Sequence, residues 1–250
     1  MDNLGEAQDV NKGLWPADQP IGQHFSVKQN LPRMLDMLDA HGIKATYFAE
    51  SWSLDVYPDT VEDMKRRGHE IAWHGFQHEP WSGLSAEQEE ESFRKSFAKA
   101  EEHGIVYEGF RPPGGSINER TWELLKRHGV KYSSPLGEFG VEKGIVVLPF
   151  EWRGVDAFWY MEKFAGIRKS LGEHEDVFQP EDFKQWLFAK IQEVADAGGY
   201  LSILFHPFLQ TNDERFAVMD EVLQRISSDA ELWCAPCNQV SEWVAKHSEL

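Results

Sequence analysis

The chain has 250 residues, of which 41% are hydrophobic and 13% aromatic, so it is long and apolar enough to bury a sizeable core. Its formal net charge is −17 and its acidic runs are interleaved with Lys and Arg, which excludes the basic stripe that nucleic acid or an anionic membrane requires. The sequence contains no apolar run of the roughly 18 residues that span a membrane, and its start, MDNLGEAQDV, does not resemble a signal peptide. It therefore predicts a cytoplasmic globular protein.

Helical and extended patterns alternate along the chain. Residues 31–41 carry apolar side chains at helical spacing, and the β-branched and aromatic run at 43–49 predicts a strand. A helix near 59–67 leads to the short apolar strand EIAWH at 70–74. The alternation then continues to the end of the chain, with a helix opened by a capping box of Ser85 and Gln88, a short strand before Arg111, helices at 118–129, 180–199, 215–226 and 239–247, and strands at 130–134, 145–150, 200–206 and 232–235.

Short strands separated by helices are typical of parallel βαβ units. Seven candidate strands without a Gly/Ser-rich break favour a closed α/β barrel that residues 1–250 form as one domain, with an open doubly wound sheet as the alternative. The segment 156–177 has the least regular pattern. We expect it to form a long loop or insert at the carboxyl ends of the strands, where barrel enzymes place their active sites.

Two histidines at a strand end are the first candidates for chemistry. His74 ends the strand EIAWH, and Gly75 permits a bend sharp enough to bring His78 back beside it. Two imidazoles placed in this way reach one ion at roughly 2.0 to 2.1 Å, the usual zinc–nitrogen distance. The spacing is only modestly specific, because two packing or surface histidines also produce it.

Three further polar groups occupy comparable positions. Arg111 begins the loop RPPGG, whose prolines and glycines make it rigid, so the arginine can orient a carboxylate. His206 ends the apolar run YLSILFH and offers the side chain that most often transfers protons in enzymes. At the amino terminus, Asp2, Asn3 and Glu6 offer oxygen ligands or a base. Each group alone is more often structural, but together they describe a mononuclear metal site.

The cysteines form one C-x-x-C pair, Cys234 and Cys237. No second pair completes a structural zinc site, so we interpret them as incidental thiols, with a redox pair as the alternative.

The order of these motifs resembles the polysaccharide deacetylase superfamily, carbohydrate esterase family 4, with its NodB-like homology domain, and within it a cytoplasmic branch. HGFQH resembles the family's H-[ST]-x-x-H motif with Gly75 in the second place, RPPGG resembles R-x-P, and LFHP resembles the last histidine motif. DNLGEA resembles the end of the first motif, in which an aspartate pair follows the first strand. The resemblance extends from Asp2 to about residue 244 and implies a distorted (β/α)7-type barrel whose first strand is missing or truncated.

The resemblance also implies a function and a set of site residues. The function would be hydrolysis of a non-peptide carbon–nitrogen bond, by metal-dependent deacetylation of an N-acetylated carbohydrate, with zinc as the first choice of divalent ion. Its roles fall on three groups: catalytic Asp2, Arg111 and His206; metal ligands His74, His78 and either Asp2 or Asn3; and substrate contacts at Pro113, Gly114 and Trp152. Asn3 stands where the family places a carboxylate ligand.

Two alternatives remain open. The first is a small-amide hydrolase of the allantoinase or cyclic-imide type that works without metal, which Asn3 favours. The second is an inactive carbohydrate-binding relative that uses aromatic side chains such as Trp152 as sugar platforms. The expected partner is a small-molecule or oligosaccharide substrate, and an oligomer is compatible with the sequence.

Overall fold

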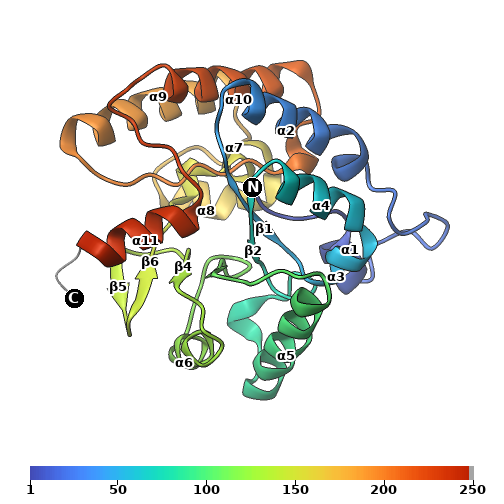
Figure 1. Cartoon of the computed structure of the whole chain (residues 1–250). Coiled ribbons are helices and arrows are strands. Elements are labelled where there is room, and N and C mark those ends of the chain that lie inside the picture. The colour runs from blue at the N-terminus through green and yellow to red at the C-terminus, as the bar shows by residue number, and fades with distance from the viewer. Residues whose placement is uncertain (248–250) are drawn as a thin grey trace.

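The computed structural model describes residues 1–247 and has a mixed α/β fold with a mostly parallel sheet (Figure 1). The six-stranded sheet has the order β1-β2-β3-β4-β6-β5, and every neighbouring pair is parallel except β5 and β6. The fold class expected from the sequence is therefore confirmed. The strands are β1 (Thr46–Ala49), β2 (Glu70–Trp73), β3 (Gly109–Phe110), β4 (Tyr132–Ser133), β5 (Gly140–Glu142) and β6 (Ile145–Val147).

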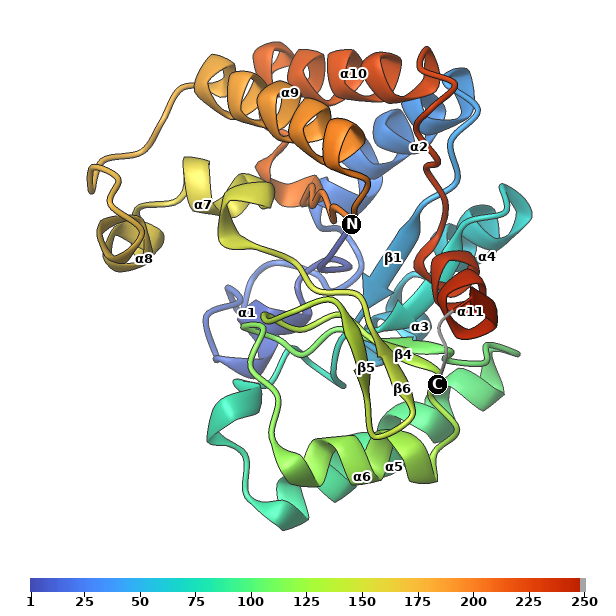
Figure 2. The same cartoon turned by 90° about the vertical axis from the view of Figure 1, so that its left-hand side faces the viewer.

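Helices surround this sheet, with α2, α9 and α10 packed together in one group and α5 beside α6 at the opposite end (Figures 1 and 2). Each helix expected from the sequence is present, and the capping box of Ser85 and Gln88 opens α5. None of the helices in the described chain has the length and apolarity needed to cross a membrane. The helices are α1 (Ala7–Asn11), α2 (Leu31–Ala40), α3 (Trp52–Val56), α4 (Pro58–Arg66), α5 (Ala86–Glu102), α6 (Glu119–Arg127), α7 (Asp156–Tyr160), α8 (Ala165–Ser170), α9 (Pro180–Ala197), α10 (Asp213–Ser227) and α11 (Cys237–His247).

Of the two forms expected for the segment 156–177, a long loop or an insert, the structure has an insert with short helices. It contains α7, a short 3-10 turn at Glu162–Phe164 and α8. Arg168 is fully buried and donates to the carbonyl oxygens of Phe158, Met161 and Glu175. These bonds give the segment a fixed internal structure.

The first residues of the chain occupy part of the place of a first strand. The ammonium group of Met1 donates to the carbonyl of Thr46 at 2.8 Å, and the amide of Phe48 donates to the carbonyl of Met1 at 2.8 Å. Asp2 forms an isolated parallel bridge with Phe48. The expected truncated first strand is therefore a two-residue extension of the sheet beside β1.

The sheet does not close into a barrel. Strands were expected at 200–206 and 232–235, but within the described chain only Leu204 pairs there, in an isolated bridge with Val155. A cavity of about 820 Å³ is lined both by β1 residues such as Thr46 and Phe48 and by the segment 200–203. Because a strand needs a hydrogen-bonded neighbour, the segment beside this cavity remains irregular despite its apolar composition.

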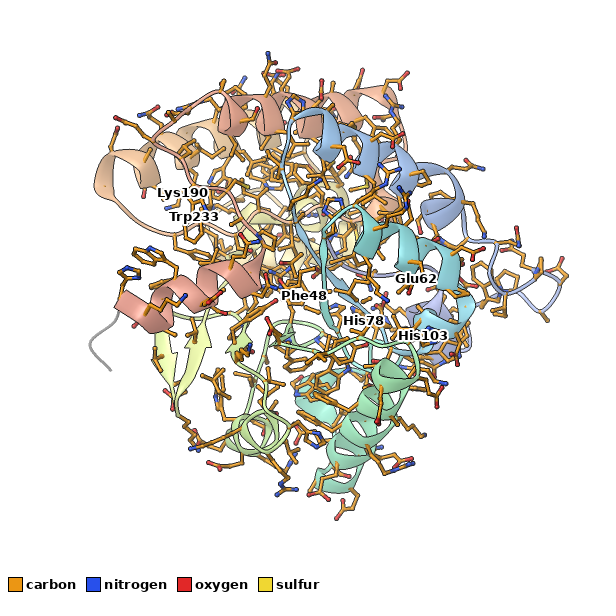
Figure 3. All side chains as sticks on the ribbon, viewed as in Figure 1. Phe48, Glu62, His78, His103, Lys190 and Trp233 are labelled. Atoms are coloured by element: carbon orange, nitrogen blue, oxygen red, sulfur yellow. The ribbon has the colours of Figure 1, made fainter. Side chains whose placement is uncertain are left out.

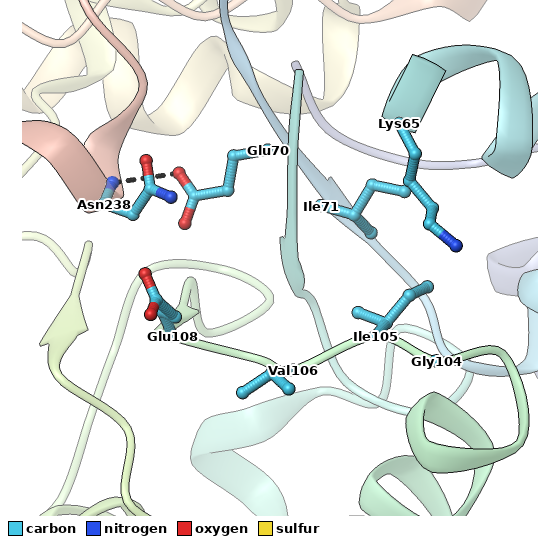
Figure 4. Close-up of a pocket in the computed structure, with 8 residues that line it drawn as sticks. All are labelled: Lys65, Glu70, Ile71, Gly104, Ile105, Val106, Glu108 and Asn238. Atoms are coloured by element: carbon cyan, nitrogen blue, oxygen red, sulfur yellow. Dashed lines mark hydrogen bonds between the residues drawn. The ribbon is translucent and has the colours of Figure 1, made fainter. Parts of the chain in front are cut away.

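A half-buried carboxylate joins the amino ends of the strands. Glu70 begins β2 and accepts hydrogen bonds from the hydroxyls of Thr46 and Tyr132 at 2.6 and 2.9 Å and from the amide of Asn238 at 3.0 Å. Figure 4 shows this carboxylate beside Asn238, in an open pocket that Glu108 also lines. Burial raises the pKa of Glu70. These bonds connect β1, β2, β4 and the start of α11.

Replacing Glu70 with alanine should destabilise the fold, because three donors lose their shared acceptor. We expect the free energy of unfolding, measured by urea titration with tryptophan fluorescence, to fall by about 2–4 kcal/mol. Glu108→Ala is the control, since its ion pair with Lys131 is largely exposed and should be worth less than about 1 kcal/mol. Equal losses in the two variants would contradict the role given to Glu70.

Candidate active site

The candidate site forms where the carboxyl ends of the parallel strands meet. Glu50, His74 and Arg111 directly follow β1, β2 and β3, and all three are buried. Asp2 reaches the same edge through its bridge with β1, and His206 follows the bridge at residue 204. In Figure 3, Phe48 of β1 and His78 are labelled near the middle of the molecule. Parallel strands collect functional groups at this edge in α/β proteins generally.

The two histidines of HGFQH lie side by side. The ring centroids of His74 and His78 are 4.9 Å apart, and both Gly75 and His78 have positive φ values of 82° and 58°. Nδ1 of His74 donates to the carbonyl oxygen of Arg111 at 2.7 Å, so its Nε2 keeps a lone pair. The side-chain nitrogen of Gln8 donates to Nδ1 of His78 at 2.7 Å, which places the proton of the neutral ring on Nε2. Metal binding through Nε2 requires the Gln8 amide to turn over, so that its oxygen accepts from Nδ1.

Glu50 completes a group of three potential ligands. One donor atom from each of Glu50, His74 and His78 lies within 4.8 Å of the other two. The Glu50 carboxylate accepts from Asn3 Nδ2 at 2.9 Å and from the amide of Leu4 at 2.8 Å. Two imidazole nitrogens and one carboxylate oxygen match the ligand sets of catalytic zinc sites, which leave a position open. The donor chemistry therefore fits a divalent ion.

Burial controls the charge of these three groups. It raises the pKa of Glu50 to about 8 and lowers the pKa of His74 to about 4. The pKa of His78 is also lowered, first by burial and then by the charge of His74. At neutral pH the imidazoles are unprotonated, which is the state that binds metal, and binding would release the proton of Glu50.

Asp2 and Arg111 form a buried ion pair beside this group. Nη1 of Arg111 donates to Asp2 at 2.8 Å, while Nη2 donates to the hydroxyls of Ser134 and Ser202 at 2.9 and 3.1 Å. Burial alone would raise the pKa of Asp2, but the charges of Arg111, His74 and His206 lower it to about 2. Asp2 is therefore an oriented, ionised carboxylate.

His206 forms a second buried pair, with Asp156. Its Nδ1 donates to one oxygen of the Asp156 carboxylate at 2.5 Å, and its backbone amide donates to the other at 2.7 Å. Gln210 donates to the second oxygen as well, at 3.1 Å. With Nδ1 committed to Asp156, the ring exchanges protons through Nε2.

The remaining residues expected at the site have definite positions. Asn3 donates to Glu50, and the Glu6 carboxylate is occupied by the hydroxyl of Tyr57 and the amide of Gly22. Within the described chain Asp2 and Glu6 lie outside the three-ligand group. Metal binding by Asp2 or Asn3 stays a prediction.

The three expected substrate contacts are near or on the surface of the same region. Pro113 is buried against the histidine loop, with its Cγ 3.4 Å from where a Cβ of Gly75 would lie, and Gly114 is exposed. Trp152 is half-buried, with its ring 5.4 Å from that of Phe150. Phe150 lies in turn 5.4 Å from the guanidinium of Arg111. Their contact with substrate remains a prediction.

Sequence reasoning missed Glu50, Asp156 and Gln8. Glu50 follows an apolar strand as His74 does, so the same strand-end argument could have found it. Asp156 follows Val155, whose pairing is a single bridge with no strand pattern of its own. Gln8 lies on the short helix α1, and nothing in the sequence marks its contact with His78.

The chain resembles known proteins in both sequence and structure. The family profile described as polysaccharide deacetylase matches residues 18–133. A peptidoglycan deacetylase of Helicobacter pylori is 24% identical over 188 residues, which cover 73% of this chain and 61% of that protein. The chain spans less than half of three further curated relatives, namely 38%, 34% and 46% of their lengths.

Solved structures share the fold over nearly the whole chain. A putative polysaccharide deacetylase from Mycobacterium smegmatis superposes with a TM-score of 0.82 at 25% identity, covering 98% of this chain and 90% of that one. An allantoinase superposes with a TM-score of 0.77 at 17% identity, covering 98% and 89%. The second likeness concerns the fold alone.

Gly75 allows the loop between the two histidines to close, and this can be tested. The Glu79 carboxylate accepts from the amides of Phe76 and Gln77 at 2.9 and 3.2 Å, and a Cβ at Gly75 would lie 2.6 Å from Glu79 Oε2. We expect Gly75→Ala to lower the free energy of unfolding by about 2–4 kcal/mol, from backbone strain plus this collision.

Gly114→Ala is a matched control for this measurement by urea titration. Gly114 has a φ of 81°, close to the 82° of Gly75, but no atom lies within 4 Å of its Cβ position. It should lose only the strain contribution of about 1 kcal/mol. If both variants lose the same stability, Glu79 does not constrain residue 75.

Proposed function

Because the chain belongs to the polysaccharide deacetylase superfamily, we propose that it hydrolyses the acetamide of an N-acetylated carbohydrate with a divalent ion, zinc being the first choice. The observation that carries this proposal is the pairing of Asp2 with Arg111 and of His206 with Asp156 around the two histidines. Arg111 donates to Asp2 and its carbonyl oxygen accepts from His74, and these direct hydrogen bonds support treating the three residues as one site.

In this proposal, His74, His78 and a third ligand would hold the metal, which would supply a Lewis acid for the amide carbonyl and for water. Asp2 accepts a proton from the attacking water, and Arg111 holds the carboxylate in position. Nε2 of protonated His206 donates a proton to the leaving nitrogen, because an amine leaves an amide poorly until it is protonated. The carbon–nitrogen bond then breaks, giving acetate and a free amino sugar.

The substrate class follows from the relatives, two of which are a peptidoglycan deacetylase and a putative polysaccharide deacetylase. Pro113, Gly114 and Trp152 remain the predicted contacts for the sugar ring. A cytoplasmic location also remains a prediction, and it would favour soluble oligosaccharides over an intact cell wall as substrate.

Acetate release tests the proposed function. Purified protein loaded with zinc should release acetate from chito-oligosaccharides or peptidoglycan fragments, and removal of the metal with a chelator or His74→Ala should abolish the release. Allantoin serves as the comparison substrate, because an allantoinase shares the fold. Turnover of allantoin alone, or full acetate release by metal-free protein, would contradict the proposal.

Asp156 should act by positioning His206. In Asp156→Asn the amide can donate to Nδ1 and stabilise the wrong tautomer, so we expect kcat to fall by about 100- to 10,000-fold with little change in KM. Gln210→Ala removes only an outer hydrogen bond to Asp156 and should change kcat less than about 10-fold. Steady-state kinetics of both variants measure this. An Asp156→Asn enzyme with the parent kcat would remove Asp156 from the mechanism.

A further inference from the structure

The two imidazoles are neutral and do not balance the charge of a divalent ion, so a carboxylate ligand would stabilise the metal site. The residue at position 3 cannot supply that carboxylate, because its side chain is an amide. We propose that Glu50 supplies the carboxylate ligand and that Asn3 is a positioning residue that holds it. The proposal rests on the metal site of the proposed function, but it concerns only which side chains bind the ion.

Strand pairing places residues 3 and 50 side by side. Asp2 pairs with Phe48 in a parallel bridge, so Asn3 and Glu50, which come shortly after them, leave the sheet at the same edge. Asn3 has a φ of 65°, a conformation that asparagine adopts more readily than most residues, and its side-chain amide lies 2.9 Å from Glu50 Oε1. An oxygen ligand can therefore come from either strand end, but only Glu50 offers a carboxylate.

The surroundings of Glu50 are those of a ligand. Its exposed fraction is 0%, and within the described residues no Lys or Arg forms an ion pair with it. Its carboxylate accepts hydrogen bonds from two neutral donors, the Asn3 amide and the Leu4 backbone. Buried carboxylates are normally paired with a cation or coordinate a metal. The two imidazoles within 4.8 Å supply the other ligands for such a metal.

The neighbouring carboxylates are already engaged. Asp2 is bound by Arg111, and both oxygens of Glu6 accept hydrogen bonds, from Tyr57 and Gly22. The amide at position 3 is also the complement that Glu50 requires. An aspartate there would bring two carboxylates to hydrogen-bond distance, where they repel each other. Glu50, which follows β1, is therefore the ligand, and Asn3 near the amino terminus holds its carboxylate in place.

Zinc affinity tests this assignment without reference to catalysis. Isothermal titration of the metal-free full chain with zinc, or competition with a chelator of known affinity, gives the Kd. We expect Glu50→Gln to weaken zinc binding by at least about 100-fold, and Asn3→Gly, which keeps the backbone conformation, to weaken it by about 10- to 100-fold. The double variant Asn3→Asp, Glu50→Gln should recover part of the loss, because it returns one carboxylate to the pair.

Glu70→Gln is the control, since Glu70 is a half-buried, hydrogen-bonded carboxylate of the adjacent strand at the opposite end of the sheet, and this variant should leave the Kd unchanged. Urea titration of each metal-free variant verifies folding. Parent-like zinc affinity in folded Glu50→Gln would overturn the proposal, as would a parent chain that binds no divalent ion. The parent chain could also bind zinc but release no acetate. Loss of zinc binding in Glu50→Gln would then support the ligand assignment and contradict the proposed function.

Discussion

The candidate site depends on the attachment of two residues, Met1 and Asp2, to the edge of β1. Two backbone hydrogen bonds of 2.8 Å hold Met1 against Thr46 and Phe48, and this register points Asp2 at Arg111. The same register carries the next residue to the end of β1. The proposed base Asp2 and the proposed support Asn3 therefore depend on one short contact, and a shift by a single residue would turn their side chains to the opposite face.

The sheet is open beside this two-residue attachment. The cavity of about 820 Å³ adjoins Met1 and Arg111, so the ion pair has an apolar void on one side where a barrel would have another strand. Met1 is buried, and this burial lowers the pKa of its ammonium group. The pair of Asp2 and Arg111 links the terminus to the residue that follows β3 and is the centre of the proposed chemistry.

The sequence predicts much of this arrangement because local patterns determine it. Amphipathic spacing and capping residues specify the helices, and the polar residue after each apolar run identified His74 and Arg111. The expectations that proved wrong, and the residues that were missed, depend on contacts between distant parts of the chain. The run 200–206 has strand composition but lacks a neighbour to pair with. Asp156 follows a single bridge, which no strand pattern marks. The contact between Asn3 and Glu50 joins residues that are far apart in the sequence.

A crystal structure of the zinc-loaded protein, with anomalous scattering recorded at the zinc edge, tests the central claim most directly. We expect one peak in the anomalous map, about 2.0–2.2 Å from one nitrogen of His74, one nitrogen of His78 and one oxygen of Glu50. Asp2 should still be bound to Arg111. A peak bound by Asp2 in place of Glu50, or an amino terminus detached from β1, would contradict it.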